Sequence, residues 1–244
     1  MSSTFKVLLI GDSCEDEYIY GKCEKINSEA PVPVIKFSKV ETKAGMAANV
    51  CLNLQAFGVD ITFLTNSEKI VKTRFIDEKS NHQILRVDNE EKIKPLLLPI
   101  STNNFDAIII YDRDKGYVTE SKIFEIVNQS SCPIFVASKK QNLPNKNNCY
   151  IITDEYRDDI ENLIVSMGSK GCVYKNTLYP LENIKVYNMI GTNDIFLSSL
   201  VYGFLKYAKI DNALCFANKA FSIAVQQKGS YILSDTDIDS LCEN

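Results

Sequence analysis

One carboxylate of this sequence, Asp194, lies in a pattern that could support phosphoryl transfer. Asp194 follows the small polar turn Gly191-Thr192-Asn193 and opens a strongly apolar stretch that predicts a helix over 194–208. The turn, which we expect to follow a strand near Val186, would place backbone N–H groups at a helix N-terminus, where the helix dipole favours anions. A phosphoryl group could bind there while Asp194 takes the proton from an attacking hydroxyl. Taken alone, the pattern favours a plainer interpretation, since an acidic residue in a first helical turn stabilises the helix by roughly 0.5–1 kcal/mol.

The rest of the chain predicts the elements that would position this turn. Short runs of aliphatic and β-branched residues predict strands, and apolar residues at helical spacing, such as those ending at Gly58, predict helices. Alternating strands and helices are typical of an α/β fold with a doubly wound, mainly parallel sheet. The predicted strands cover 5–10, 61–64, 107–111, 133–136, 150–152, 163–166 and 172–174, and the predicted helices 47–57, 117–127, 194–208 and 212–227.

Two segments, 17–43 and 71–90, suit a separate small β-sheet, or lid. Pro31 and Pro33 remove ladder donors and therefore favour an edge strand. We expect one domain over 1–244 that carries this lid. The link between the strands at 150–152 and 163–166 has only about ten residues, which is short for a helical crossover. Either those strands are antiparallel, or a covering helix is missing.

Composition narrows the function. The 244 residues carry a net charge of −4, which favours neither a nucleic acid nor an anionic membrane as partner. The N-terminal apolar run, Val7 to Ile10, is too short for a membrane span or a signal core. The eight cysteines form no CxxC pair, and His82 has no cysteine close by, so a zinc site is not expected. These features predict a cytoplasmic protein in a reducing compartment.

Several motifs carry a resemblance to a known family. Residues 11–66 resemble the start of bacterial heptose 7-phosphate kinases, which are PfkB or ribokinase-like carbohydrate kinases. The segment SEAPVPV (28–34) is typical of the heptose kinases, whereas Gly11-Asp12, Asp16 and Ala47-Ala48-Asn49 match the wider superfamily. The resemblance continues along most of the chain through VKTRF (71–75), ILRVD (84–88), YDRDKG (111–116), SMGSKG (166–171), IGTND (190–194) and FANKAFSIAV (216–225).

The resemblance implies a ribokinase-like fold and a kinase that uses ATP and Mg²⁺ on the anomeric hydroxyl of a heptose 7-phosphate, a lipopolysaccharide precursor. It makes Asp194 the catalytic base and Gly191, Thr192 and Asn193 the anion hole. The implied substrate contacts are Asp16, Gly45, Asn49, Lys72, Arg74, Arg86 and Lys115. The implied nucleotide contacts are Ser166, Gly168, Gly171 and Asn218, although a packing role suits Asn218 equally well. Lid strands in this superfamily often pair between subunits, which implies a homodimer.

Four positions depart from the family pattern. Met46 replaces a glycine, Asn193 a glycine and Ala137 an aspartate, and Asp158 stands where the family has a glutamate tied to the metal-water network. These departures keep a second hypothesis open, namely a catalytically weakened homologue that binds a sugar phosphate or a nucleotide. A third hypothesis is an active kinase for another sugar, such as a hexose phosphate.

Overall fold

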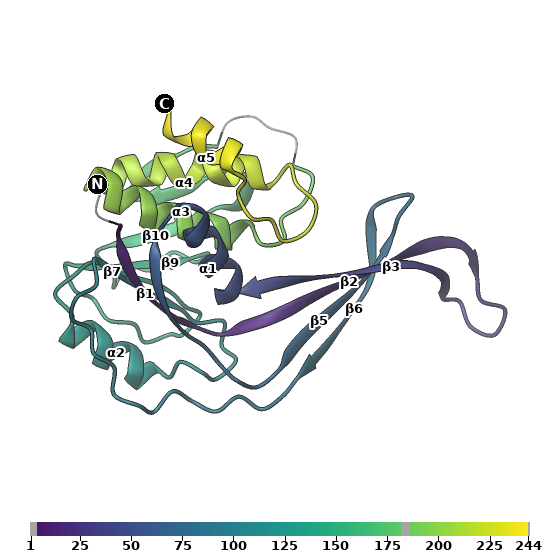
Figure 1. Cartoon of the computed structure of the whole chain (residues 1–244), viewed down its shortest axis with the longest axis horizontal. Helices are drawn as coiled ribbons and strands as arrows, with labels where there is room; N and C mark the ends of the chain where they lie inside the picture. The colour runs from purple at the N-terminus through teal and green to yellow at the C-terminus, as the bar shows by residue number, and fades with distance from the viewer. Residues whose placement is uncertain (1–3, 182–185, 244) are drawn as a thin grey trace.

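The computed structural model describes residues 4–181 and 186–243, which form a central sheet and a separate lid sheet (Figure 1). Eight strands form the central sheet in the order β12-β11-β10-β9-β8-β7-β1-β4. Their bounds are β1 Lys6–Gly11, β4 Asp60–Leu64, β7 Ala107–Tyr111, β8 Ile134–Ala137, β9 Cys149–Thr153, β10 Leu163–Ser166, β11 Cys172–Tyr174 and β12 Thr177–Tyr179.

The central sheet is parallel from β4 to β10, and β11 then pairs antiparallel with both β10 and β12. Two neighbouring strands are almost completely buried: Val7 to Ile10 in β1 and Ala107 to Tyr111 in β7 are at most 2% exposed. Continuous apolar strands of this kind are typical of a sheet covered on both faces. The predicted α/β fold with a mainly parallel sheet is confirmed.

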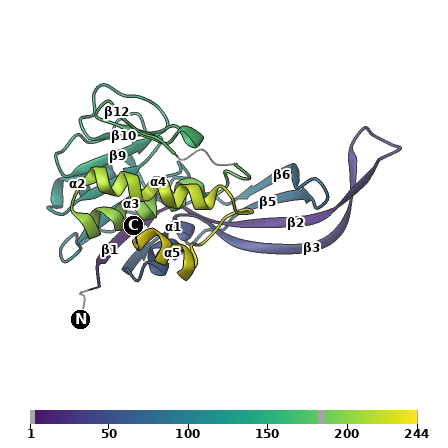
Figure 2. The ribbon, with the colours of Figure 1, turned by 90° about the horizontal axis from the view of Figure 1, so that it is seen from above.

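Helices cover the two faces unequally. α1 (Ala47–Ala56), α3 (Thr192–Tyr207) and α4 (Ile210–Ala224) lie on one face, and α2 (Glu120–Gln129) lies on the other (Figures 1 and 2). The small α5 (Asp235–Cys242) contacts α4. None of the helices among residues 4–181 and 186–243 is long and apolar enough to span a membrane.

Two crossovers lack a helix. Residues 138–148 join β8 to β9, and residues 154–162 join β9 to β10, without any helix or strand of their own. Both strand pairs are nevertheless parallel. Of the two alternatives left by the sequence, the missing helix is therefore correct for the short link after β9. Tyr156 in that link is 71% exposed.

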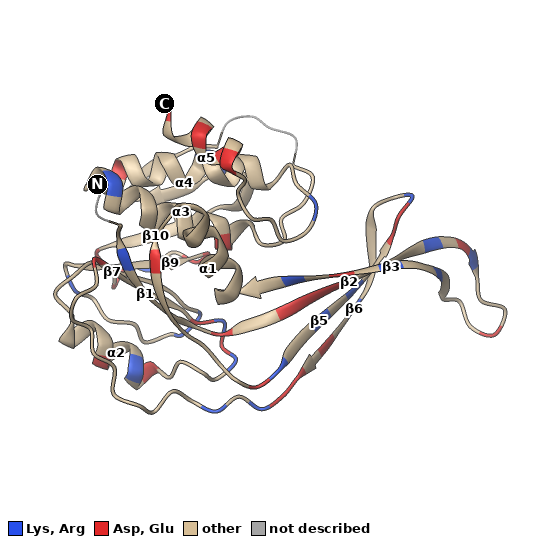
Figure 3. Cartoon of the chain, viewed as in Figure 1, with Lys and Arg blue, Asp and Glu red and all other residues tan. Residues whose placement is uncertain are grey.

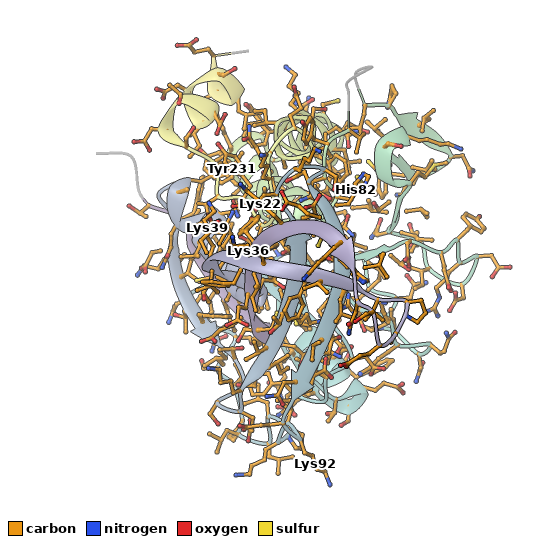
Figure 4. All side chains as sticks on the ribbon, turned by 90° about the vertical axis from the view of Figure 1, so that its right-hand side faces the viewer. Lys22, Lys36, Lys39, His82, Lys92 and Tyr231 are labelled. Carbon is orange, nitrogen blue, oxygen red and sulfur yellow. The ribbon has the colours of Figure 1, made fainter. Side chains whose placement is uncertain are left out.

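The lid is a four-stranded sheet in the order β3-β2-β5-β6. Its strands are β2 (Ser13–Ile26), β3 (Pro33–Met46), β5 (Ile70–Asp77) and β6 (His82–Glu90), so the lid is slightly longer than predicted at three of its four limits. The β2–β3 hairpin projects far beyond the central sheet, and charged residues of both signs lie along the lid strands (Figures 1 and 3). Lys22 of β2 and Lys36 and Lys39 of β3 lie on the projecting part (Figure 4).

The predicted approach to the catalytic turn was wrong in one respect. Residues 186–189 form no strand, and the helix begins at Thr192, two residues before the predicted start. Residues 182–185 lie outside the described part of the chain. β12 and α5 were not predicted, because the residues of β12 are mostly exposed and α5 buries only Leu241.

Candidate active site

Asp194 lies in the first turn of α3 and is 7% exposed. Gly191 precedes the helix in the left-handed conformation, with φ 74°, and its carbonyl accepts from the N–H groups of Asp194 and Ile195, each at 3.2 Å. A Cβ atom at Gly191 would also lie 3.1 Å from Asn49 Nδ2. Both the backbone conformation and the close approach therefore call for glycine at this position.

Both oxygens of the Asp194 carboxylate accept hydrogen bonds. Asn49 Nδ2 donates to Oδ2 at 3.0 Å, and the Tyr111 hydroxyl donates a short bond to Oδ1. Burial raises the pKa of Asp194 to about 6, although the bonds from Tyr111 and Asn49 and the charge of Arg113 act in the opposite direction. A carboxylate with a pKa near 6 is ionised at neutral pH and is still basic enough to accept a proton.

A cleft of about 230 Å³ opens beside Asp194 and runs under the lid. It brings together many of the residues predicted from the resemblance, although they come from three strands of the lid and from the turn that starts α3. Those that line it are Asp16, Lys72, Arg74, Arg86, Gly191, Asn193 and Asp194. Cys14, Met46, Tyr111 and Arg113 line it too and were not predicted as site residues.

Asp16 and Arg74 form a buried ion pair in this cleft. Arg74 Nη1 lies 2.9 Å from Asp16 Oδ1, and the two side chains are only 9% and 7% exposed. Ser230 Oγ donates to the other carboxylate oxygen at 3.1 Å. A Cβ atom at Gly45 would lie 2.6 Å from Asp16 Oδ2, so Gly45 leaves the room that this carboxylate occupies. Gly45 itself does not line the cleft, so its predicted substrate contact stays a prediction.

Met46 replaces a glycine at a position that needs one. Its backbone has φ 55° and ψ −132°, a conformation that is nearly restricted to glycine and costs about 1–3 kcal/mol. Its side chain is 9% exposed and lines the cleft. Burial of a methionine side chain stabilises the fold by roughly 1.5–3 kcal/mol, so the two contributions are of similar size. The fold therefore tolerates Met46 at this position. Its side chain makes the cleft narrower than a glycine would.

Asp12 is a buried residue that the sequence reasoning did not single out for a role. It is 0% exposed, and its carboxylate accepts from the N–H groups of Arg113 (2.7 Å), Lys115 (3.3 Å) and Tyr117 (3.2 Å). Burial raises the pKa of Asp12, and these three bonds lower it. Asp12 therefore fixes the loop between β7 and α2. The sequence signal was its position directly after a buried strand that ends in glycine.

Lys115 does not line the cleft. Its ammonium group forms an ion pair with Glu90 at 2.6 Å, and its side chain is 23% exposed. The structure thus separates it from the other predicted substrate contacts.

A second hollow lies on the other side of Asn193, over the ends of β7, β8, β9 and β10. Among its lining residues are Ser166, Thr153, Asp154 and Asn193. Gly168 and Gly171 shape the tight turn after β10, with φ values of 59° and 96°. Only Ser166 of the predicted nucleotide residues lines this hollow.

Asn218 has its side-chain amide occupied in packing. It donates to the Tyr179 carbonyl at 2.7 Å and accepts from Cys172 Sγ at 3.8 Å, which ties α4 to β11 and β12. Of the two interpretations of Asn218, the structure supports packing.

Asp158 lies apart from both Asp194 and Asn193, in a hollow with Tyr156 and Glu161. No group of three His, Cys, Asp or Glu side chains in the described ranges is arranged to hold a metal ion. The carboxylate that lines the hollow beside Asn193 is Asp154. Mg²⁺ is commonly held by one or two carboxylates together with substrate phosphates, so the site fits a magnesium ion carried by a nucleotide, with Asp154 in place of Asp158.

Comparison with known proteins agrees with this geometry. The model of the pfkB family of carbohydrate kinases matches residues 152–237, which include Asp194. The bifunctional protein HldE of a Nitratiruptor species is 29% identical over 92% of this chain and 62% of that protein. HldE of Campylobacter jejuni is 25% identical over 96% of this chain and 64% of that protein. The chain spans slightly under two thirds of the length of these relatives.

Solved structures of similar fold include ribokinases. Ribokinase of Thermotoga maritima superposes with a TM-score of 0.72 at 13% identity, covering 98% of this chain and 100% of that one. Arabidopsis thaliana ribokinase, solved with ribose and ATP, superposes with a TM-score of 0.66 at 12% identity, covering 98% of this chain and 99% of that one. The predicted ribokinase-like fold and the predicted resemblance are therefore confirmed.

Proposed function

Because the chain is a relative of the pfkB family carbohydrate kinases with a ribokinase-like fold, we propose that it transfers the γ-phosphoryl group of ATP to the anomeric hydroxyl of a heptose 7-phosphate. One observation carries the proposal. A buried carboxylate with a pKa of about 6, Asp194, lies at the start of a helix and lines one hollow, and the neighbouring Asn193 lines both that hollow and a second one. One hollow has the cationic lining that a phosphosugar needs, and the other would receive the nucleotide.

The sugar side is the cleft under the lid. The Asp16 carboxylate can accept from sugar hydroxyls, and its ion pair with Arg74 fixes its orientation. Lys72 and Arg86 line the same cleft and can bind the phosphate that the substrate already carries. Arg86 pairs with Asp88 at the exposed end of the cleft, at 2.8 Å, and such an exposed pair is easily exchanged for a phosphate.

The nucleotide side is the hollow beyond Asn193. The turn Gly191–Asn193 would direct the N-terminus of α3 at the γ-phosphate, and Ser166 would lie beside the nucleotide. Asp154 would help to hold a magnesium ion bound to the phosphates, and that ion would offset their negative charge. Because ATP is the donor, we place the reaction in the cytoplasm.

Asp194 then accounts for the proton. The sugar hydroxyl oxygen attacks the γ-phosphorus in line, and its proton passes to the Asp194 carboxylate. The new oxygen–phosphorus bond forms as the bond to the β–γ bridging oxygen breaks, and that electron pair leaves with ADP. The hydroxyl of Tyr111 and the amide of Asn49 keep the carboxylate in place. Their hydrogen bonds also lower its pKa and thus keep it ionised at neutral pH.

An ADP-release assay with ATP, Mg²⁺ and a panel of sugars tests the proposal. We expect turnover with heptose 7-phosphate that exceeds turnover with the unphosphorylated heptose, because Lys72 and Arg86 would have no phosphate to bind in the latter. Faster turnover with a hexose phosphate would mean that the proposed substrate is wrong, but it would still support the proposed kinase activity. Absence of turnover with every member of the panel would refute the kinase.

A weakened homologue is the second candidate. Two side chains favour it. Met46 narrows the sugar cleft, and Asn193 lines both hollows. Calorimetry separates the candidates, because binding of ATP or phosphosugar without turnover supports the weakened homologue.

We further propose that two chains pair through their lids. The edge strands β3 and β6 carry exposed apolar side chains, including Phe37 at 64% and Leu85 at 53% exposure. Lys36 and Lys39 on the same edge disfavour open-ended strand addition, so a closed dimer is the expected product. Sedimentation equilibrium at micromolar concentration should give twice the chain mass of 27.5 kDa. The pairing would be contradicted if the wild type sedimented as a monomer and the variant Phe37→Glu sedimented in the same way.

A further inference from the structure

Arg113 differs from the other arginines of the chain. The sequence has four arginines, and all four lie in the described ranges. Arg74, Arg86 and Arg157 each form an ion pair with a carboxylate, at 2.9, 2.8 and 2.7 Å. Within residues 4–181 and 186–243, no carboxylate lies within ion-pair distance of the Arg113 guanidinium, which contacts the Tyr111 ring at 5.4 Å from its centroid. A partly buried guanidinium without a carboxylate partner is free to bind another anion.

The position of Arg113 indicates which anion that is. Only Tyr111, Arg113 and Asn193 line both the sugar cleft and the nucleotide hollow among the described residues. Arg113 is the one cation of these three, and its charge lowers the pKa of Asp194. A phosphoryl group that passes from one hollow to the other must pass these residues.

The loop that carries Arg113 is already fixed in place. Its backbone N–H donates to the buried Asp12 carboxylate at 2.7 Å. The preceding Asp112 is 1% exposed; it accepts from Ser138 Oγ at 2.6 Å and pairs with Lys140 at 3.1 Å. A cation held in this way needs little rearrangement when the substrate binds, and this is the condition under which a charge contributes most to catalysis.

We propose that Arg113 is a catalytic residue that binds the equatorial oxygens of the γ-phosphoryl group while it moves from ATP to the sugar. The inference rests on the proposed kinase function and extends it. The guanidinium stays protonated throughout, donates hydrogen bonds to the phosphoryl oxygens, and exchanges no proton with Asp194. The Asn193 side chain occupies part of the space before α3. This side chain leaves less room for a phosphate at the backbone N–H groups of the turn. Arg113 therefore supplies positive charge in addition to these N–H groups.

Substitution of Arg113 tests the inference against a matched control. We expect Arg113→Met to lower kcat by about 10²-fold or more, with a smaller change in the KM of the sugar. Arg113→Lys should give an intermediate rate, because lysine keeps the charge but not the planar fork. Arg157→Met removes an arginine that is paired with Asp159 away from the cleft, and it should leave kcat unchanged. A kcat for Arg113→Met equal to that of Arg157→Met would overturn the inference and leave the kinase function intact.

The pH profile separates phosphoryl binding from a mere effect on Asp194. If Arg113 acts only by lowering the pKa of Asp194, the rate of Arg113→Met should recover at high pH, where Asp194 is ionised in both proteins. We expect the loss to persist at about pH 8.5, well above the pKa of Asp194, and full recovery there would contradict direct binding. Calorimetry gives a readout that does not depend on turnover. Arg113→Met should lose any preference of the wild type for ATP over ADP, and an unchanged preference would count against the contact even if no sugar is phosphorylated.

Discussion

Replacement of Asp194 by asparagine is expected to lower kcat/KM by about 10²–10⁴-fold, which is the usual contribution of a positioned general base. Asparagine has nearly the same shape and can still accept the hydrogen bond from Tyr111, but it cannot take a proton. The comparison is made by ADP release with ATP and the best phosphosugar of the panel. The binding of ATP should change little, because the carboxylate faces the acceptor hydroxyl and not the adenine end of the nucleotide.

A folding control belongs to this experiment. The folded-state pKa of Asp194, about 6, is above its ordinary value of 3.8. The folded chain therefore binds more protons than the unfolded chain between these values, and the unfolding free energy falls as the pH rises from about 4 to about 6. Urea unfolding of the wild type and the asparagine variant at about pH 4 and about pH 7 gives this contribution as the difference between the two proteins, because carboxyls with a lowered pKa, such as that of Glu41, act in the opposite direction in both. A variant that keeps wild-type turnover while folded would exclude Asp194 as the base.

The second large effect concerns the buried ion pair under the lid. Arg74→Met should lower the unfolding free energy by about 3–5 kcal/mol, because it leaves the buried Asp16 carboxylate without its partner. The hydrogen bond from Ser230 remains, but it does not replace a positive charge. Urea unfolding followed by circular dichroism gives the value.

Arg86→Met is the matched control for stability. It removes the same side chain from an ion pair with Asp88, but here the arginine and aspartate side chains are 48% and 29% exposed. Exposed pairs contribute about 0–1 kcal/mol, so this variant should unfold close to the wild type. Equal losses for the two variants would mean that burial of the Asp16–Arg74 pair does not govern its contribution.

Much of the fold was predictable, because strand and helix patterns depend on which residues must be buried. The runs at Val7–Ile10 and Ala107–Tyr111 have no charged residue, and both became fully buried parallel strands. The first lid segment was found from its prolines and partial alternation, and the second from two extended runs around a turn-like stretch at 78–81. Both signals depend on local conformation. The pairing of β9 with β10 was not predictable, since strand direction after a short link depends on which neighbour the sheet provides.

The site was predictable only where a motif marked it. Asp194, Asp16 and Asn49 follow from the resemblance, and the structure brings Asn49 within 3.0 Å of the Asp194 carboxylate. Tyr111 and Arg113 were missed, since 83 residues separate Tyr111 from Asp194 in the sequence. Only the folded sheet, whose strand β7 ends at the cleft, brings them together. Lys115 and Asn218 had suitable chemistry, but their side chains are engaged elsewhere by Glu90 and by Tyr179.

The pH dependence of kcat/KM in the wild type tests the central claim most directly, namely that a buried carboxylate at the start of α3 removes the acceptor proton. The rate should rise with pH through a single ionisation near 6, the pKa of Asp194, and then level off. The profile is measured from about pH 5 to about pH 8, with ATP saturating and the phosphosugar well below its KM. A rate that stays constant over this range would contradict the account, because no group with the pKa of Asp194 would then control the transfer.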